Sequence, residues 1–277
     1  IVACWLGFVS IIGNDGSVLW SYLIGPRHPH IPPGMYSAVL SIVVGDIDGD
    51  GLNEVVCGLN DKNICVLSSD GHLVWFFQSG SNIYDLASGD INNDGKTDLA
   101  IAAFHNVYVF DGQGMLLWKY NLTESQVNMS GYYSPTPYMG QFLGCAHKIA
   151  LADLDGDRLD DIVVAGEEMV YAIKSDGKLL WEIQIPGLHT LIHVGDVNGD
   201  GMSDVAIGNI EIGSNLFVIR NDGKLLWSYK YLRDHFGVEP IAVDLGDLDG
   251  DGKCEVAAIF GGSHAQIIDD DGSDMWS

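Results

Sequence analysis

The chain has 277 residues, of which 47% are hydrophobic and 18% charged, and its formal net charge at pH 7 is −25. The apolar content excludes an intrinsically disordered chain. The few Lys and Arg residues form no cluster, which disfavours nucleic acid and anionic membrane surfaces as partners. No apolar run reaches the roughly 18 residues that a membrane-spanning helix needs, so we expect no membrane insertion by this segment.

The chain begins with an apolar stretch, IVACWLGFVSII, at residues 1–12. This stretch has neither the basic leader nor the cleavage site of a signal peptide. Residues 1–20 align without gaps with residues 162–181, which places Asp15-Gly16 on Asp176-Gly177. We therefore expect strands here. A first strand with its own Asp loop is expected upstream of residue 1 or from another chain.

Two motifs recur along the sequence and dominate its interpretation. An Asp-rich loop occurs at residues 46–54, 90–98, 153–161, 196–204 and 247–255. An Asp-Gly turn before an apolar run that ends in tryptophan leads to Trp20, Trp75, Trp118, Trp181, Trp227 and Trp276. The Asp loops start 44, 63, 43 and 51 residues apart. This spacing matches one four-stranded blade of a β-propeller.

Each repeat has the pattern of four short strands. The first ends at the Asp loop, the second follows it, a hairpin leads to the third, and the Asp-Gly turn leads to the fourth with its tryptophan. We predict an all-β fold in which residues 1–277 form a single β-propeller domain. Six four-stranded blades are visible, the first without its strand one, and seven are possible in the full-length protein. The blades are expected at about 1–25, 37–80, 82–121, 146–186, 189–231 and 240–277, with insertions at 26–36, 121–145 and 231–239.

Each Asp loop has the ligand pattern of the first nine positions of an EF-hand calcium loop. Side-chain oxygens stand at positions one, three and five, a backbone carbonyl at seven and a carboxylate at nine. We therefore predict about five structural Ca²⁺ ions, each of which stabilises its blade because it binds the folded state only. Arg158 replaces the usual glycine at position six, so the third loop is expected to be the weakest. The predicted ligands are Asp46, Asp48, Asp50, Leu52 and Glu54; Asp90, Asn92, Asp94, Lys96 and Asp98; Asp153, Asp155, Asp157, Leu159 and Asp161; Asp196, Asn198, Asp200, Met202 and Asp204; and Asp247, Asp249, Asp251, Lys253 and Glu255.

The Asp loops resemble the FG-GAP/VCBS repeats of the integrin α-subunit propeller and of many secreted microbial proteins. The DGKLLW turns, as at residues 176–181 and 222–227, resemble the Trp repeats of quinoprotein-like propellers. Together the two resemblances cover essentially the whole chain. They imply a calcium-binding propeller, usually of seven blades in integrin-like proteins. Quinoprotein dehydrogenases bind their cofactor with an adjacent Cys-Cys pair, which this sequence lacks, so we expect no redox cofactor.

The three insertions are expected on the propeller face opposite the Asp loops, and loop elaboration on a rigid scaffold usually carries binding. The aromatic and proline residues of the largest insertion either contact a protein or glycan ligand or pack the loop onto the scaffold. They are Tyr132, Tyr133, Pro135, Pro137, Tyr138 and Phe142. Asn121 and Asn128 begin two possible glycosylation sequons in this insertion, which favours a secreted protein.

Most histidines map to the same face, whereas His72 lies on the opposite face and His193 within a strand. Together with Glu167, Glu168, Glu211 or Glu239, these histidines either form a Zn²⁺ or Cu²⁺ site or an acid–base pair, or they are ordinary loop residues. We favour the last interpretation. The histidines concerned are His28, His30, His105, His147, His189, His235 and His264.

The five cysteines show no metal-binding spacing. Cys57 and Cys65 flank a predicted hairpin and either form a disulfide or remain buried free thiols, which we slightly favour; Cys4, Cys145 and Cys254 are not placed in pairs.

We expect an extracellular or cell-surface scaffold for adhesion, for binding of protein or glycan partners, or for a larger surface assembly. We assign no catalytic residue. The alternative is a polysaccharide lyase-like or metal-dependent enzyme that uses the histidine-bearing face.

Overall fold

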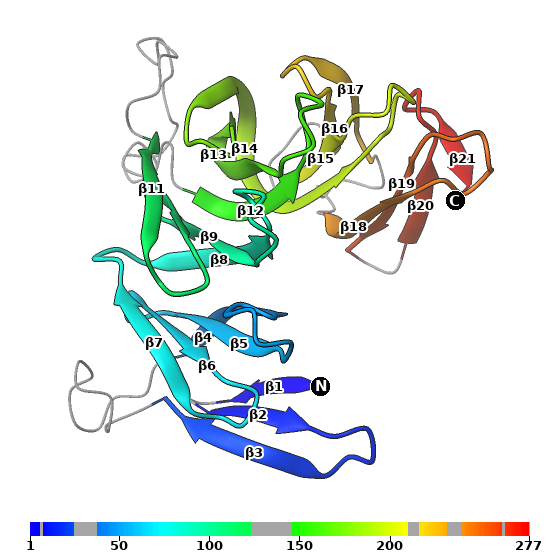
Figure 1. Cartoon of the computed structure of the whole chain (residues 1–277). Helices are drawn as coiled ribbons and strands as arrows, with labels where there is room; N and C mark the ends of the chain where they lie inside the picture. Colours follow the sequence, from blue (N-terminus) through cyan, green and yellow to red (C-terminus); the bar gives the residue numbers. More distant parts are fainter. Residues whose placement is uncertain are drawn as a thin grey trace, which may run out of the picture. The chain divides into compact units, whose positions relative to one another are not determined.

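The computed structural model describes residues 1–5, 8–24, 38–122, 146–209, 216–231, 240–261 and 264–276. These residues fold into strands β1–β21, which pair in antiparallel sheets (Figure 1). The chain divides into unit one, residues 1–90 and 94–119, and unit two, residues 91–93 and 120–277. The prediction of an all-β fold is confirmed. Within the described ranges, no helix is long and apolar enough to cross a membrane.

Unit one contains three sheets, and each runs in sequence order. The first has three strands, β1 (Val2–Trp5), β2 (Phe8–Ile12) and β3 (Val18–Leu23), as the alignment with residues 162–181 predicted. The second contains β4 (Val39–Gly45), β5 (Glu54–Leu59), β6 (Asn63–Leu67) and β7 (Leu73–Gln78). The third contains β8 (Ile83–Gly89), β9 (Asp98–Ala103), β10 (Asn106–Phe110) and β11 (Leu116–Asn121), whose last residues belong to unit two.

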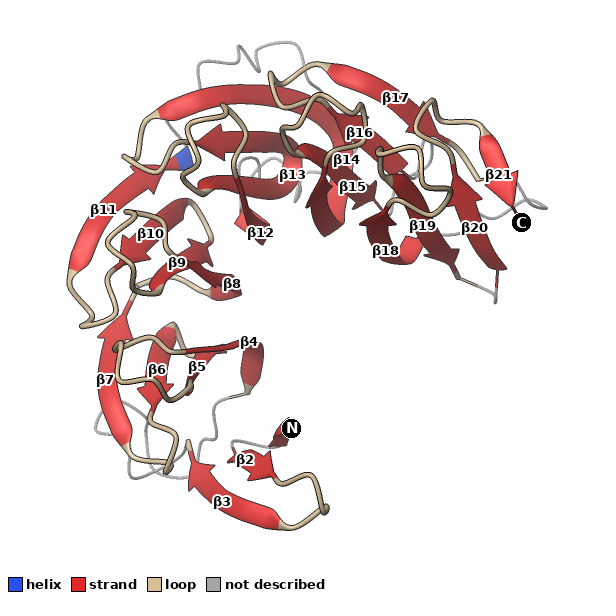
Figure 2. Cartoon of the chain, turned by 45° about the vertical axis from the view of Figure 1, so that its right-hand side comes forward, coloured by secondary structure: helices blue, strands red, loops and turns tan. Residues whose placement is uncertain are grey.

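Unit two contains a six-stranded and a four-stranded sheet (Figure 2). The first consists of β12 (Ala146–Ala152), β13 (Asp161–Ile173), β14 (Leu179–Gly195), β15 (Asp204–Asn209), β16 (Leu216–Ile219) and β17 (Leu225–Tyr229). The second consists of β18 (Pro240–Gly246), β19 (Glu255–Phe260), β20 (His264–Ile268) and β21 (Asp274–Trp276).

The six-stranded sheet joins two repeats that the sequence predicted as separate four-stranded sheets. One half of β14 pairs with β13 and the other half with β15, because the connection between them stays extended and Leu188 pairs with Glu167. The side-chain amide of Asn209 donates to the carbonyl of Pro186, 2.7 Å away, and holds this connection. The strands predicted as second and third in the repeat at residues 146–186 likewise form one element, β13, with a left-handed residue at Glu168 (φ 60°).

The core of each unit lies between neighbouring sheets. Every residue of β5, β6, β9, β13 and β15 is buried, as expected for strands covered on both faces. In unit one, Val56 and Ile64 of one sheet pack with Ile101 and Phe110 of the next. In unit two, Val218 packs with Val243 and Phe260. The repeats within a unit are therefore stacked face to face by apolar burial.

Within each unit, the tryptophan of one repeat is hydrogen-bonded to the Asp-Gly turn of the next repeat. The indole N–H donates to a turn carbonyl in four described pairs, Trp20 to Ser69, Trp75 to Gly112, Trp181 to Asn221 and Trp227 to Asp270, at 2.6–3.3 Å. The glycine of the same turn lies against the ring, since a Cβ added at Gly223 would lie 2.8 Å from Cγ of Trp181. This glycine also has a positive φ of 81°. Glycine is therefore required at this position for two reasons: the backbone is left-handed, and the indole ring of Trp181 leaves no room for a Cβ.

We expect Gly223→Ala to destabilise the protein more than Gly16→Ala. Both glycines occupy the same place in an Asp-Gly turn with φ near 80°, but no atom lies within 4 Å of a Cβ at Gly16. Gly16→Ala should cost about 1–2 kcal/mol of backbone strain. Gly223→Ala should cost a further 1–3 kcal/mol, roughly, for the overlap with Trp181. Denaturant unfolding of the two variants measures the difference, and equal destabilisation would contradict this role of the tryptophan.

Candidate metal-binding loops

The five Asp loops connect β4 to β5, β8 to β9, β12 to β13, β14 to β15 and β18 to β19, and they share one hydrogen-bond pattern. The carboxylate at position one accepts the backbone N–H of position six at 2.8–3.2 Å in every loop. The carboxylate at position five accepts the N–H of position seven at 2.8–2.9 Å. The side chains that were predicted as ligands therefore also shape the backbone of their own loops.

Two positions of each loop have left-handed backbone, of which only position six was expected from the sequence. Position six has φ between 71° and 92°, and in the third loop this residue is Arg158, at 71°. A residue with a side chain is strained there. The prediction that the third loop is the weakest calcium site stays a prediction. Position four is also left-handed, at 59° for Asn93 and 75–86° for the glycines of the other loops. The repeated glycine at position four in the sequence was the signal for this second turn.

The carboxylate at position nine is buried in all five loops. Glu54 is 1% exposed, and Asp98, Asp161, Asp204 and Glu255 are 0% exposed. In the four loops at residues 46, 153, 196 and 247, it accepts the backbone N–H of position two at 2.5–3.2 Å. Since this position also begins the second strand of the repeat, the carboxylate ties the start of the loop to the sheet.

The loops bring carboxylates close enough together to hold a cation. One oxygen from each member lies within 4.8 Å of the others in the groups Asp46–Asp48–Asp50, Asp153–Asp155–Asp161, Asp247–Asp249–Asp251 and Asp249–Glu255–Asp269. The loops at residues 90–98 and 196–204, with Asn92 and Asn198 at position three, form no group of three carboxylates among the described residues. Oxygen-only ligand sets of this kind suit a hard divalent cation.

Two buried carboxylate oxygens in these loops have no hydrogen-bond donor, Oδ1 of Asp46 and Oε1 of Glu255. A buried charged oxygen without a donor is costly, whereas a bound cation would satisfy it. The residues present therefore fit a metal ion in the first and fifth loops, as the predicted calcium sites require.

Burial raises the pKa of three of the position-nine carboxyl groups. The pKa of Asp161 and that of Asp204 are raised to about 6, chiefly because burial disfavours the charged form, although backbone N–H donors oppose this. Neighbouring carboxylates add to the effect, Asp155 on Asp161 and Asp200 on Asp204. Burial likewise raises the pKa of Glu54. Binding of a cation, whether a proton or a metal ion, therefore relieves the cost of burying the negative charge of these carboxylates.

In the third and fourth repeats, the Asp-Gly turn lies beside the Asp loop. The N–H of Ser175 donates to Oδ1 of Asp161 at 3.2 Å, and that of Asn221 donates to Oδ1 of Asp204 at 2.9 Å. Lys174, the first residue of its turn, places its ammonium 2.6 Å from Oδ2 of Asp155 in the third loop. The position-nine carboxylate thus connects loop and turn within one repeat.

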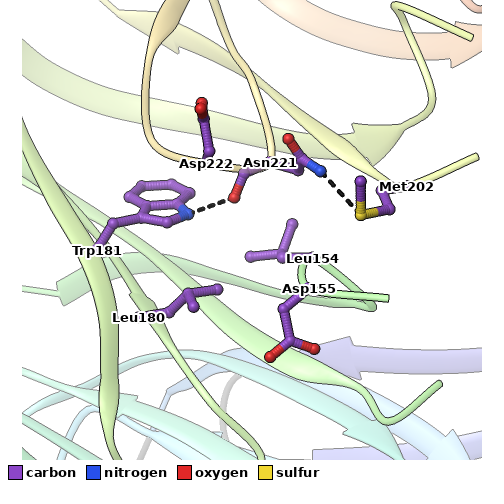
Figure 3. A pocket seen from close by; sticks show the side chains of 7 residues that line it. All are labelled: Leu154, Asp155, Leu180, Trp181, Met202, Asn221 and Asp222. Atoms are coloured by element: carbon purple, nitrogen blue, oxygen red, sulfur yellow. Dashed lines mark hydrogen bonds between the residues drawn. The ribbon is translucent and has the colours of Figure 1, made fainter. Parts of the chain in front are cut away.

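A pocket of about 360 Å³ lies between two repeats next to the third and fourth loops (Figure 3). The indole of Trp181 forms one side, where it donates to the carbonyl of Asn221, and the amide of Asn221 contacts the sulfur of Met202 at 3.0 Å. The lining residues are Leu154, Asp155, Leu180, Trp181, Met202, Asn221 and Asp222. Asp155, a member of the carboxylate group of the third loop, and Met202, at position seven of the fourth loop, both line the pocket, so it borders two of the predicted metal sites.

The histidine hypothesis receives little support from the described residues. His189 is completely buried, and burial lowers its pKa to about 4. Backbone groups of Gly166, Ile185 and Met169 near the ring oppose this lowering of the pKa. Burial also lowers the pKa of His147, and Glu167 and Glu168 are each 9% exposed. Among the described side chains, these four do not form a metal-binding group.

Several predicted residues lie outside the described ranges. They are His28, His30, His235, Glu211, Glu239, Asn128, Cys145 and the aromatic residues of the 121–145 insertion. Asn121 is described, and it is partly exposed at the end of β11.

The two hairpin cysteines face each other, as their positions suggested. Cys57 of β5 is the direct cross-strand partner of Cys65 of β6, and both are fully buried. Both are free thiols in this structure, in agreement with the favoured interpretation. The hydrogen bond with the Cys65 thiol, and then burial, raise the pKa of Cys57, which disfavours the reactive thiolate.

The FG-GAP-like repeat family matches this chain at residues 90–164, 153–207 and 196–258, which together cover more than half of it. The chain belongs to this family of repeat proteins. No curated protein matches the chain.

Solved structures share the fold at low sequence identity. The biofilm matrix protein Bap1 of V. cholerae is 21% identical, with a TM-score of 0.63 over 94% of this chain and 42% of its own. The rhamnogalacturonan lyase YesW is 18% identical, with a TM-score of 0.63 over 98% of this chain and 58% of its own. BBS1N, in a complex with ARL6DN, is 14% identical, with a TM-score of 0.60 over 96% of this chain and 72% of its own. This chain thus spans less than two thirds of Bap1 and of YesW.

In metal-free buffer, we expect Asp204→Asn to become more stable relative to the unchanged protein as the pH rises from about 4 to above 6. The folded protein retains the Asp204 proton up to about pH 6, whereas the unfolded chain releases it near 3.8. Raising the pH therefore charges a buried group and destabilises the unchanged protein, while asparagine stays neutral.

Denaturant unfolding of both proteins with a chelator at several pH values measures this trend. The comparison cancels other titrations, such as that of His189, whose lowered pKa acts in the opposite direction. A stability difference that does not change with pH would contradict the assigned cause.

Proposed function

We propose that this chain is part of a calcium-stabilised β-propeller that serves as an extracellular or cell-surface scaffold for binding or adhesion. The observation that carries the proposal is the fivefold recurrence of one loop geometry, with buried carboxylate oxygens that lack hydrogen-bond donors in two of the loops. Membership in the FG-GAP-like family and the consecutive antiparallel sheets support the propeller.

Calcium is the cation that best matches these loops. The ligands are oxygens only, most of them charged, and Ca²⁺ accepts about six to eight oxygens with flexible geometry, whereas Mg²⁺ requires a strict octahedron and retains its waters. Sites of this kind in extracellular modules are filled when calcium is near millimolar, which supports a location outside the cytosol.

The proposed partners are proteins or glycans bound on the face opposite the Asp loops. The three insertions that would carry this binding lie largely outside the described residues. Similarity of fold to a biofilm matrix protein and to a protein solved in complex with another agrees with a scaffold function.

A lyase-like enzyme remains the alternative, because the fold is also similar to that of a rhamnogalacturonan lyase. His189 does not favour it. Its ring is completely buried, so it cannot reach a polysaccharide substrate without rearrangement.

We expect calcium to raise the free energy of unfolding, by about 2.7 kcal/mol for each site at a hundredfold excess over its dissociation constant. Calcium at millimolar concentration after chelation should raise the melting temperature, and magnesium at the same concentration should raise it much less. Calorimetric melting measures both. No response to calcium would refute the calcium-stabilised scaffold.

We expect the recognition function to depend on the largest insertion. A variant in which residues 123–145 are replaced by a short Gly/Ser linker should retain its calcium-dependent melting and lose binding on protein and glycan arrays. Turnover of acidic polysaccharide by the unchanged protein would instead favour the enzyme, with His147→Ala as the variant that should abolish it.

A further inference from the structure

The first residue of each Asp-Gly turn occupies the same position within its turn but differs in charge from one repeat to the next. In all six described turns, the carbonyl of this residue accepts the N–H of the turn glycine, and its own N–H donates to the carbonyl of the residue that follows the glycine. The residues at this position are Gly13, Ser68, Asp111, Lys174, Arg220 and Asp269. Since the backbone is the same, the side chain alone determines what this position offers to the loop.

In the fifth loop this residue adds a carboxylate. An oxygen of Asp269 lies within 4.8 Å of oxygens of Asp249 and Glu255, so Asp269 joins positions three and nine of the loop. Asp249 is shared with the second group, Asp247–Asp249–Asp251. The fifth loop therefore gathers five carboxylates, one of them from outside the nine-residue motif.

The buried carboxylate of this site, that of Glu255, has one oxygen without a hydrogen-bond donor. Glu255 is 0% exposed, and its Oε2 accepts the N–H of Leu248 while Oε1 has no donor. In the third and fourth loops, the equivalent oxygen accepts a backbone N–H of the turn, from Ser175 or Asn221. In the fifth repeat the equivalent turn N–H, that of Asp270, donates to Oδ1 of Asp269 instead, at 3.0 Å. Asp269 thus takes the donor that would otherwise satisfy Glu255, and it leaves Oε1 available to a cation.

The third loop shows the opposite arrangement. Lys174 places its ammonium 2.6 Å from Asp155, a member of the Asp153–Asp155–Asp161 group. Asp157 and Asp161 also raise the pKa of Lys174, after the larger effect of Asp155. An ammonium that is covalently part of the protein therefore already offsets one negative charge of this loop and occupies its position-three carboxylate. Arg220 in the fourth repeat instead bonds to Asp222 of its own turn.

One further cation lies near the fifth loop. Lys253, at position seven, forms an ion pair with Asp270 and lies 4.0 Å from Asp251. Because the Lys253 ammonium is paired with Asp270, it does not pair with the carboxylates of the Asp249–Glu255–Asp269 group, which stay available to a metal ion.

We propose that the first turn residue sets the calcium affinity of the third and fifth loops. Asp269 is a ligand from outside the motif that makes the fifth loop the tightest site, and Lys174 replaces the metal ion in the third loop. This inference rests on the proposed calcium binding and assigns unequal roles to the five loops.

Asp269→Asn tests the first half of the proposal. It should weaken the tightest calcium dissociation constant, measured by competition with a chromophoric chelator, by about tenfold or more, as loss of a metal-site partner usually does. The matched control is Asp271→Asn, which removes the same charge two residues away. Asp271 caps its own turn by accepting the N–H of Ser273, so this variant should leave the constant unchanged.

Lys174→Gln tests the second half. It should add one calcium ion to the count obtained by native mass spectrometry at the same free calcium. Lys178→Gln should add none, because Lys178 pairs with exposed Asp176 of its own turn. Circular dichroism confirms that each variant is folded.

Calcium binding by the unchanged protein with no effect of Asp269→Asn, or no extra ion in Lys174→Gln, would overturn this proposal and leave the calcium scaffold intact. Absence of calcium binding to the unchanged protein would overturn both.

Discussion

The buried carboxylate at position nine is the interaction on which the edge of each repeat depends. In the third and fourth repeats, one oxygen accepts a backbone N–H at the start of the loop and the other accepts an N–H of the Asp-Gly turn. One side chain therefore fixes the relative positions of the first, second and third strands of a repeat. Its charge is costly in the buried environment, and this cost is the physical reason for a cation at this edge.

The tryptophan contacts extend this arrangement from one repeat to the next within each unit. The turn that contacts the position-nine carboxylate on one side also accepts the indole N–H of the preceding tryptophan, as at Asn221. Adjacent Asp loops also touch directly, since the N–H of Cys254 donates to the carbonyl of Asp196 at 2.8 Å. A metal ion bound in one loop would therefore stabilise the junction with its neighbour as well as its own repeat.

Sequence reasoning predicted the repeats because both motifs are local and recur at a constant offset from their strands. The strand positions, the three-stranded first sheet and the facing pair Cys57 and Cys65 follow from that register. The continuity of β14 was missed, because Pro186 and Gly187 resemble a break and the stabilising contact from Asn209 comes from a distant part of the sequence. The burial of His189 has no local signal either, since it depends on which sheets cover the ring.

The candidate site was predicted only in part for the same reason. The nine loop positions are contiguous and could be identified from spacing, including the strained Arg158. Lys174 and Asp269 follow their loops by more than ten residues, and they approach the loops only through the pairing of the strands. The effect of their opposite charges therefore becomes visible only in the folded structure, where Lys174 offsets one negative charge of its loop and Asp269 adds a negative charge to its own.

The metal content of the native protein tests the central claim most directly. After desalting into metal-free buffer, elemental mass spectrometry should find at least four calcium ions per chain, because the third loop already contains the ammonium of Lys174. A preparation that is folded and contains no stoichiometric calcium, even after equilibration with millimolar calcium, would contradict the assignment of the Asp loops as calcium sites.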